Sequence, residues 1–260
     1  MVQNDPRTRF QHPGQAVSVY PPLTSAGSLA ALDIETGRPK WVFAAEYERK
    51  FEAKNLHGLP SAAQTIPDAW DVFTSSPAVV DGVVYVGCRD AHVYAVDAAT
   101  GRRRWDYPTS KSWAIGTPAV RDGVVYVGTS DSSRFMALDA KTGRLRFNFK
   151  AGAYVFSSAA LAVDLAYFGS HNGRLYAVDA KTGALAWEFQ TEASKSDPMK
   201  VLNADGTLNE AIFAPVFGDF QDMYVAFYRF VSIGAIVSSP AVDRGTVYVG
   251  SMDGNLYALR

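Results

Sequence analysis

The chain has 260 residues, of which 48% are hydrophobic, and a formal net charge of −1. A chain of this length can bury a sizeable core. The balanced charge argues against a nucleic-acid partner, because phosphate backbones are held by strongly basic surfaces. No apolar run approaches the roughly 18 residues of a membrane-spanning helix, so we expect no transmembrane segment.

An internal repeat organises almost the whole sequence. Apolar strands are followed by the pattern Ala-x-Asp-x-x-Thr-Gly-x-x-x-aromatic, and the spacing of about 40 residues is typical of a four-stranded propeller blade. The copies cover about residues 10–46, 74–109, 115–150, 156–190 and 236–260, and the last is incomplete. The sequence therefore predicts an all-β fold, a single β-propeller domain over residues 1–260 with about five four-stranded antiparallel blades.

The first copy is the least regular. Its Ala31-Leu32-Asp33 motif and Trp41 match the second copy without gaps, which predicts degenerate strands at about residues 10–16 and 17–22. A long insertion, residues 47–73, follows it. The segment from Glu46 to Gly58 reads like a short charged helix that the glycine ends. This insertion is interpreted either as a solvated lid or as an anion clamp made by Arg49, Lys50, Lys54 and His57.

The second copy shows the four strands most clearly. Residues 75–80 and 83–87 flank the tight turn Asp81-Gly82. Residues 92–96 then lead into Asp97–Gly101, where the carboxylate can bond backbone ahead of it and the glycine returns the chain. The only cysteine, Cys88, is interpreted as a small core residue or as a reactive thiol.

The aromatic residue that closes each motif has a structural role in this interpretation. Its ring is expected to pack between neighbouring blades, so a catalytic role is not expected for it. These docking residues are Trp41, Trp105, Phe147 and Trp187.

The second insertion, residues 191–235, combines a polar, turn-rich start with a densely aromatic end. Such a segment must cover its own propeller, a partner chain or a membrane surface, and we expect the first. Asp219 and Asp222 could pair as acid and base or bind a cation, or could serve a turn and a helix start. Tyr224 is a further candidate contact residue.

The combination of this motif with Val-Tyr-Val-Gly-Ser-x-Asp-Gly-x-Leu-Tyr-Ala-Leu before it resembles the repeat of PQQ-like, quinoprotein-type β-propellers. That family includes quinoprotein alcohol dehydrogenases and the outer-membrane assembly factor BamB. The resemblance implies a bacterial protein exported to the periplasm or cell envelope. Met1–Pro6 lacks the apolar core of a signal peptide, which leaves a cytoplasmic location open.

Closure of the ring is a separate question. Five blades fall within the range of closed propellers, and we expect closure, although the fifth copy lacks its outer strand. An open ring would expose apolar blade faces and favour a homodimer.

Strand order predicts where a ligand would bind. The loops between the second and third strands of each blade should emerge together with the connections between blades, and both insertions belong to such connections. The candidates on this face are Arg89, His92, Asp131, Arg134, His171, Arg174, Asp253 and Asn255.

These features favour a non-catalytic scaffold propeller that recognises a protein or a cell-envelope ligand. A PQQ-dependent oxidoreductase is the alternative. Relatives of that kind use a Cys-Cys pair and a bound calcium, whereas this chain has one cysteine. A carbohydrate-active propeller is a second alternative. The four histidines are too scattered to indicate a metal site, and we predict neither a catalytic residue nor a cofactor, with PQQ and calcium belonging to the first alternative alone.

Overall fold

A computed structural model describes residues 28–45, 50–54, 60–67, 73–110, 112–213 and 220–260. For residues 50–54, 60–67, 213 and 220–223 it describes the backbone alone. The predicted strands at residues 10–16 and 17–22 lie outside the described residues.

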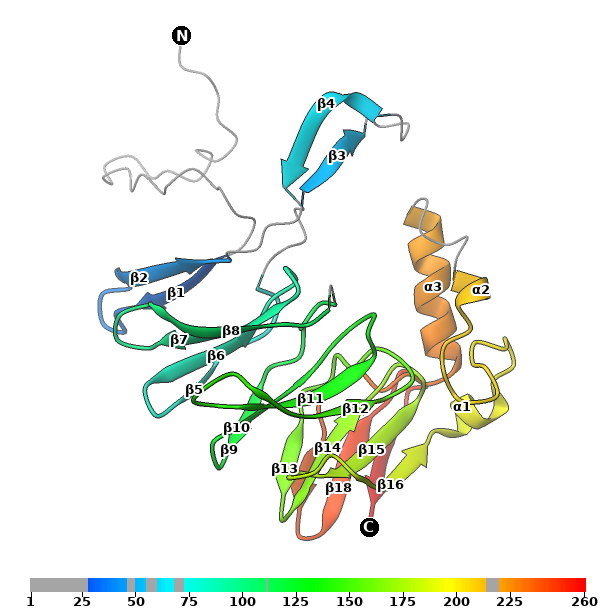
Figure 1. Ribbon diagram of the computed structural model, residues 1–260. Helices are drawn as coiled ribbons and strands as arrows, with labels where there is room; N and C mark the ends of the chain where they lie inside the picture. The colour runs from blue at the N-terminus through cyan, green and yellow to red at the C-terminus, as the bar shows by residue number, and fades with distance from the viewer. Residues whose placement is uncertain (1–27, 46–49, 55–59, 68–72, 111, 214–219) are drawn as a thin grey trace.

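Three complete blades form the centre of the molecule (Figure 1). Each is an antiparallel meander in which strands pair in chain order, which confirms the predicted all-β propeller fold. The second copy gives β5 (Ala78–Val80), β6 (Val83–Gly87), β7 (His92–Asp97) and β8 (Arg103–Pro108); the third gives β9 (Ala119–Arg121), β10 (Val124–Gly128), β11 (Arg134–Asp139) and β12 (Leu145–Lys150); the fourth gives β13 (Ala160–Ala162), β14 (Leu165–Gly169), β15 (Arg174–Asp179) and β16 (Leu185–Gln190).

The two outer copies are incomplete among the described residues. The first contributes the hairpin of β1 (Ser28–Leu32) and β2 (Pro39–Ala44), which corresponds to the outer half of a blade. The fifth is three-stranded, as its sequence indicates, with β17 (Ala241–Asp243), β18 (Thr246–Gly250) and β19 (Leu256–Leu259).

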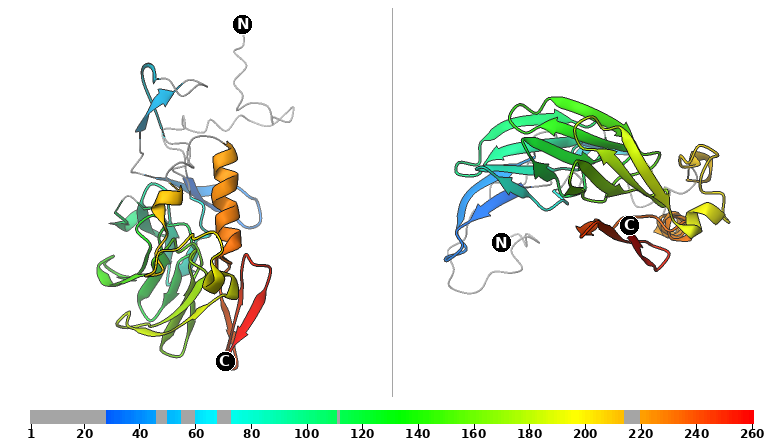
Figure 2. Two further views of the ribbon diagram at one scale, coloured as in Figure 1. Left: turned by 90° about the vertical axis from the view of Figure 1, so that its right-hand side faces the viewer. Right: turned by 90° about the horizontal axis from the view of Figure 1, so that it is seen from below.

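The blades form an open arc with the first and fifth copies at its two ends (Figure 2). Our expectation of a closed ring was therefore wrong. A closed ring needs an inner strand of the first copy beside β17. Inner strands β5, β9, β13 and β17 contact one another in turn around the arc. The described part of the first copy has no inner strand to meet β17.

The joints between blades follow from the repeated motif. Asp139 accepts bonds from the backbone N–H groups of Lys141 and Thr142 and from the Thr142 hydroxyl, all within 3.1 Å, and so forms a tight turn. The ring of Trp105 in the preceding blade lies against Gly143 of this turn, and its Nε1 donates to the Ala140 carbonyl at 2.9 Å. The turn is thus both a chain reversal and a docking surface.

The same joint recurs with small variations. Trp41 lies against Gly101 and donates to the Ala98 carbonyl at 3.0 Å. Phe147 lies against Gly183 but has no ring donor, and the Tyr126 hydroxyl bonds the Ala180 carbonyl at 2.9 Å in that joint. Arginine bonds hold the pKa of both Asp97 and Asp139 at about 2, so these turns keep their charge over a wide pH range.

The interior confirms one interpretation of Cys88. Its thiol is fully buried in an apolar cluster with Phe43, Val86 and Tyr94. Burial of this kind shields a thiol from reagents and suits a small core residue.

The first insertion is a β-hairpin rather than the short charged helix that we expected. β3 (Lys50–Lys54) pairs with β4 (Pro60–Pro67), and Phe51 lies opposite Ile66. The sequence Lys-Phe-Glu-Ala-Lys alternates polar and apolar residues, which is the period of a strand as much as of a charged helix turn. The neighbouring run of residues 60–67 supplies the pairing partner.

The described residues of the second insertion form three helices, α1 (Glu192–Ser196), α2 (Glu210–Phe213) and α3 (Phe220–Ser232). It packs on its own propeller, as expected, through a cluster that joins Val201, Leu208 and Ile233 to Ala153 of the connection between the third and fourth copies. Figure 1 shows both insertions rising from the same side of the arc.

Replacing Gly143 by alanine tests the joint. Gly143 has φ of +72°, and an added Cβ would lie 2.9 Å from the Trp105 ring. Gly123 has φ of +71° with open space around it and is the matched control. We expect Gly123→Ala to destabilise by about 1 kcal/mol through backbone strain. We expect Gly143→Ala to cost a further 1–3 kcal/mol, roughly, through overpacking. Urea unfolding measures both, and equal losses would contradict the role of the ring.

Candidate functional site

One face of the arc is built from interlaced loops. The loops between second and third strands bond directly to the connections between blades, which confirms that both emerge on the same side. The backbone N–H groups of Ala114, Ser130, Val155, His171 and Ile236 donate to the carbonyls of Cys88, Trp113, Thr129, Tyr154 and Ser170, respectively, at 2.9–3.1 Å. Side chains on this face are therefore carried by a fixed backbone.

A polar cleft of about 640 Å³ opens on this face beside the third copy. Its volume is within the range of small-ligand sites. One wall comes from the loop after β10 and from the connection after β12, and the other from the second insertion. The lining residues are Asp131, Ser132, Ser133, Lys150, Gly152, Tyr154, Asn203, Asp205, Thr207, Leu208 and Glu210. Of the predicted candidates, Asp131 is the one that lines it.

A recurring hydrogen bond explains why Asp131 faces the cleft. In the second, fourth and fifth copies the polar residue at the loop tip is bonded to a tyrosine four positions later, as Asp90 is to Tyr94 and Asp253 is to Tyr257. Asn172 makes the corresponding bond to Tyr176 at 2.9 Å. The third strand of the third copy carries Met136 at this place. Asp131 consequently has no tyrosine partner, and its exposed side chain accepts from Ser130 Oγ at 3.2 Å.

The insertion wall is held by its own turn. Asp205 accepts from the backbone N–H and the hydroxyl of Thr207 at 3.0 and 2.6 Å, and these bonds lower its pKa. Asn203 donates to the Leu208 carbonyl at 3.0 Å. The Leu208 N–H in turn donates to the Gly152 carbonyl at 3.3 Å, which ties this wall to the opposite one.

The charges of the cleft favour a cationic ligand. Three carboxylates, Asp131, Asp205 and Glu210, face one ammonium group, that of Lys150. Burial raises the pKa of Tyr154, and the charges of Asp131 and Glu210 raise it further, so its hydroxyl stays protonated. The arrangement offers several acceptors around a space large enough for an alkylammonium or guanidinium group.

Two other predicted residues lie over the second copy, away from the cleft lining. The guanidinium of Arg89 sits 3.5 Å from the centre of the Trp113 ring, a cation–π contact. His92 is half-buried, and its backbone N–H donates to Asp90 at 3.0 Å. Both side chains contact neighbouring parts of the loop face.

His171 belongs to the interior. Its ring is packed by Tyr154, Phe156 and Phe230, with centroids 4.5–5.5 Å away, and its Nδ1 lies 3.1 Å from the Tyr154 carbonyl. Burial lowers its pKa to about 4, so the ring is neutral at pH 7.

The remaining candidates are dispersed. The Arg174 guanidinium pairs with Glu188 and lies against Gly206, while Arg134 begins β11 outside the cleft lining. Asp253 and Asn255 lie on the fifth copy, where Asn255 is 3.4 Å from the Tyr257 hydroxyl. On α3, Tyr224 is exposed. Arg49, His57 and Asp219 lie outside the described residues. Lys54 lies in β3 and Asp222 lies in α3, and for both residues the structure describes the backbone alone.

Sequence reasoning missed most of the cleft. Lys150 lies 55 and 60 positions before Asp205 and Glu210, and nothing in the repeat pattern relates it to them. The absence of a tyrosine at position 136 was the one available signal, since it leaves Asp131 without the partner that Asp90 and Asp253 have.

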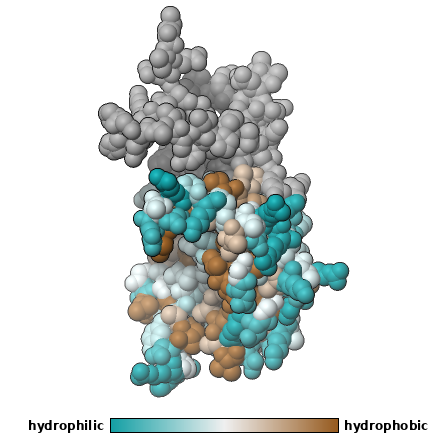
Figure 3. Space-filling model, turned by 90° about the vertical axis from the view of Figure 1, so that its left-hand side faces the viewer, coloured by the Kyte–Doolittle hydropathy of each residue, from teal (hydrophilic) through white to brown (hydrophobic). Residues whose placement is uncertain are grey.

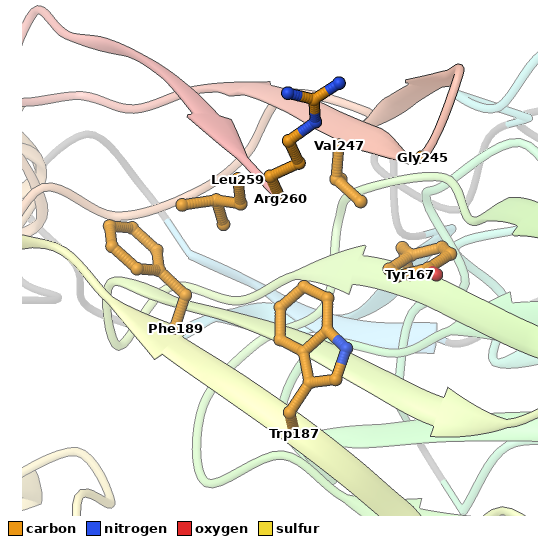
Figure 4. A pocket seen from close by; sticks show the side chains of 7 residues that line it. All are labelled: Tyr167, Trp187, Phe189, Gly245, Val247, Leu259 and Arg260. Carbon is orange, nitrogen blue, oxygen red and sulfur yellow. The ribbon is translucent and has the colours of Figure 1, made fainter.

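A second, smaller pocket of about 350 Å³ lies between the fourth and fifth copies (Figure 4). Trp187 and Phe189 on β16 face Val247 and Leu259 across it. Trp187 occupies the position at which Trp105 packs on a turn of the next blade. Among the described residues, no glycine of such a turn lies against Trp187.

Within the described part of the chain, no group of three or more His, Cys, Asp or Glu side chains is arranged to hold a metal ion. None of the described helices combines the length and apolar character that crossing a bilayer requires.

These meanders, joined by Asp-x-x-Thr-Gly turns under aromatic rings, define a β-propeller built from PQQ-like repeats. A family model described as outer membrane protein assembly factor BamB matches residues 25–207. The chain belongs to this family.

Solved structures agree in fold. The crystal structure of BamB from Moraxella catarrhalis is 19% identical, with a TM-score of 0.56 over 90% of this chain and 52% of that one. The computationally designed Ika8 protein is 14% identical, with a TM-score of 0.53 over 88% of this chain and 51% of that one. The chain thus spans about half the length of these structures.

A shorter match is to the serine/threonine-protein kinase AfsK of Streptomyces griseus. It is 30% identical over 91 residues, which are 34% of this chain and 11% of that protein.

The pKa of His171 predicts how stability changes in acid. The unfolded chain binds a proton at this residue below pH about 6.5, whereas the folded chain does so below about 4, so stability falls as the pH drops through this window. The loss amounts to roughly 3 kcal/mol. We expect His171→Phe to remove it, measured as urea midpoints at pH 7.5, 5.5 and 4.5. Parallel curves for the variant and the natural chain would contradict this.

Proposed function

We propose that the chain is a non-catalytic, protein-binding propeller of the bacterial cell envelope, and that its loop face captures a partner by a basic side chain. The observation that carries the proposal is the acidic cleft. Its carboxylates come from the loop after β10 and from the second insertion, and both segments are hydrogen-bonded to the connection after β12, so the acceptors are held in place before a ligand arrives.

The family description supports this class of function. Outer membrane protein assembly, the role printed for the matching family, requires contact with other proteins at the cell envelope. The open loop face provides a surface of that kind, since loops carried by a rigid β scaffold are common binding sites.

The quinoprotein alternative finds little support among the described residues. A quinone with calcium needs converging oxygen ligands and a charged clamp. The candidates for such a clamp are spread instead, with Arg89 on Trp113, His171 in the interior and Arg174 paired with Glu188. The residues described here do not fit the group, and no catalytic step follows from them.

Charge reversal in the cleft tests the proposal. A heptapeptide phage library selected on the full chain should become enriched in lysine and arginine. Asp131→Lys with Glu210→Lys should weaken the selected peptides at least about tenfold, because the attracting charge is reversed. Fluorescence anisotropy measures the affinities at low and high salt, and binding should weaken as salt rises.

The matched control carries the same charge change on the opposite face, at the exposed Asp122 and Asp164. Asp122→Lys with Asp164→Lys should bind the selected peptides as the natural chain does. Absence of basic enrichment, or equal losses in both double variants, would count against the cleft as the partner site.

Addition of PQQ with calcium tests the alternative directly. We expect no shift in the thermal unfolding midpoint and no dye-linked alcohol oxidation. A ligand that binds the folded state at 100 times its Kd stabilises by about 2.7 kcal/mol, so a rise of several degrees would support the quinoprotein function instead.

A further inference from the structure

The loop between β14 and β15 in the fourth copy places one buried amide side chain against both walls of the cleft. The Nδ2 of Asn172 donates to the Ala151 carbonyl at 3.0 Å and to the Gly206 carbonyl at 3.1 Å. Ala151 adjoins Lys150 in the connection after β12, and Gly206 adjoins Asp205 in the insertion wall. A single donor group therefore holds the backbones of both walls.

Two glycines allow the wall backbones to come this close to Asn172. Gly152 and Gly206 have φ of +80° and +79°, which side chains other than glycine rarely adopt. A Cβ at Gly152 would lie 3.1 Å from the Gly206 carbonyl oxygen and 3.2 Å from Asn172 Nδ2. A Cβ at Gly206 would lie 2.9 Å from the Arg174 guanidinium. The two walls thus meet at the amide because neither carries a side chain there.

The amide is held in its orientation by further bonds. Its Oδ1 accepts from the Arg174 backbone N–H at 3.2 Å, so the nitrogen is turned toward the wall carbonyls. The backbone carbonyl of Asn172 accepts from the Ser194 hydroxyl of α1 at 2.7 Å. The Tyr176 hydroxyl lies 2.9 Å from Nδ2 and donates to the Ala151 carbonyl at 2.6 Å. The side chain cannot turn away without leaving buried polar groups unpaired, which is costly.

The residue type at this position distinguishes the fourth copy. The corresponding loop tips carry Asp90, Asp131 and Asp253. An ionised carboxylate accepts hydrogen bonds and donates none, so it cannot hold two carbonyls. In the second and fifth copies the carboxylate accepts from the Tyr94 and Tyr257 hydroxyls instead. The amide therefore occurs in the copy whose loop tip contacts the second insertion.

We propose that Asn172 is a positioning residue that sets the spacing of the two cleft walls, and thereby the affinity of the cleft for a basic side chain. This role rests on the proposed function of the cleft. Carboxylates from separate segments act together on one cation at little cost when their spacing is already fixed, because less conformational freedom is lost on binding. Asn172 supplies this constraint from outside the cleft lining. It is uncharged, so its effect on affinity differs in kind from that of the lining carboxylates.

Amide hydrogen exchange of the full chain, measured by NMR without ligand, tests the positioning. The Leu208 N–H donates to the Gly152 carbonyl and so reports whether the walls stay joined. In Asn172→Ala, which removes both donors, we expect this amide to exchange at least about tenfold faster because the insertion wall opens locally. The hairpin of β1 and β2, at the end of the arc where hydrophobic and hydrophilic side chains mix on the surface (Figure 3), is a distant reference that should not change. Unchanged exchange at Leu208 would overturn the proposal.

Two further variants separate wall positioning from general damage to a loop. Asn172→Asp carries the residue of the other loop tips, which cannot donate to the carbonyls, and should speed the same exchange. Asp90→Ala removes the equivalent buried side chain in the second copy and is the matched control, so the Leu208 amide should exchange as in the natural chain. Equal acceleration in Asp90→Ala, or loss of the whole fold in both Asn172 variants, would make the role a general structural one and overturn the proposal.

The affinity for the selected basic peptides gives the functional readout. Asn172→Ala should raise their Kd at least about fivefold and leave the salt dependence of binding as in the natural chain, because every lining charge is retained. Faster exchange at Leu208 with an unchanged Kd would overturn this inference and leave the proposed function standing.

Absence of basic peptides from the selection would refute the proposed function, and with it the effect of Asn172 on affinity. The exchange of the Leu208 amide is measured without any ligand, so it separates the two failures. Faster exchange in that case would still identify Asn172 as the residue that joins the walls.

Discussion

The packing of an aromatic ring on the glycine of the next blade is the constraint on which the rest of the structure depends. A side chain at Gly143 would occupy the space of the Trp105 ring, and the left-handed backbone there already favours glycine. The carboxylate of Asp139 fixes the turn, and the Ala140 carbonyl receives the indole N–H. One five-residue motif therefore both ends a strand and sets the position of the next blade.

Because the joint lies at the opposite side of the arc, the loop face is free to vary. Tyrosine bonds to the loop-tip residue in three copies, and Met136 in the third copy removes that bond without disturbing the strand. The carboxylate of Asp131 is thereby available to the cleft. The insertion after β16 supplies the facing wall through Asp205 and Glu210. The proposed binding site therefore lies where the repeat tolerates change.

The sequence predicted the strands and turns that belong to the repeat, and little of the structure of the two insertions. Strand positions, turns and the shared face of loops and connections follow from local patterns. The strand at Lys50–Lys54 was missed because alternation and charge predict different structures there, and its pairing partner is a separate segment, Pro60–Pro67. Asp253 and Asp131 look alike in sequence, and only the residue four or five positions onward separates them. The opposite wall depends on packing around Val201 and Ile233, which no local pattern encodes.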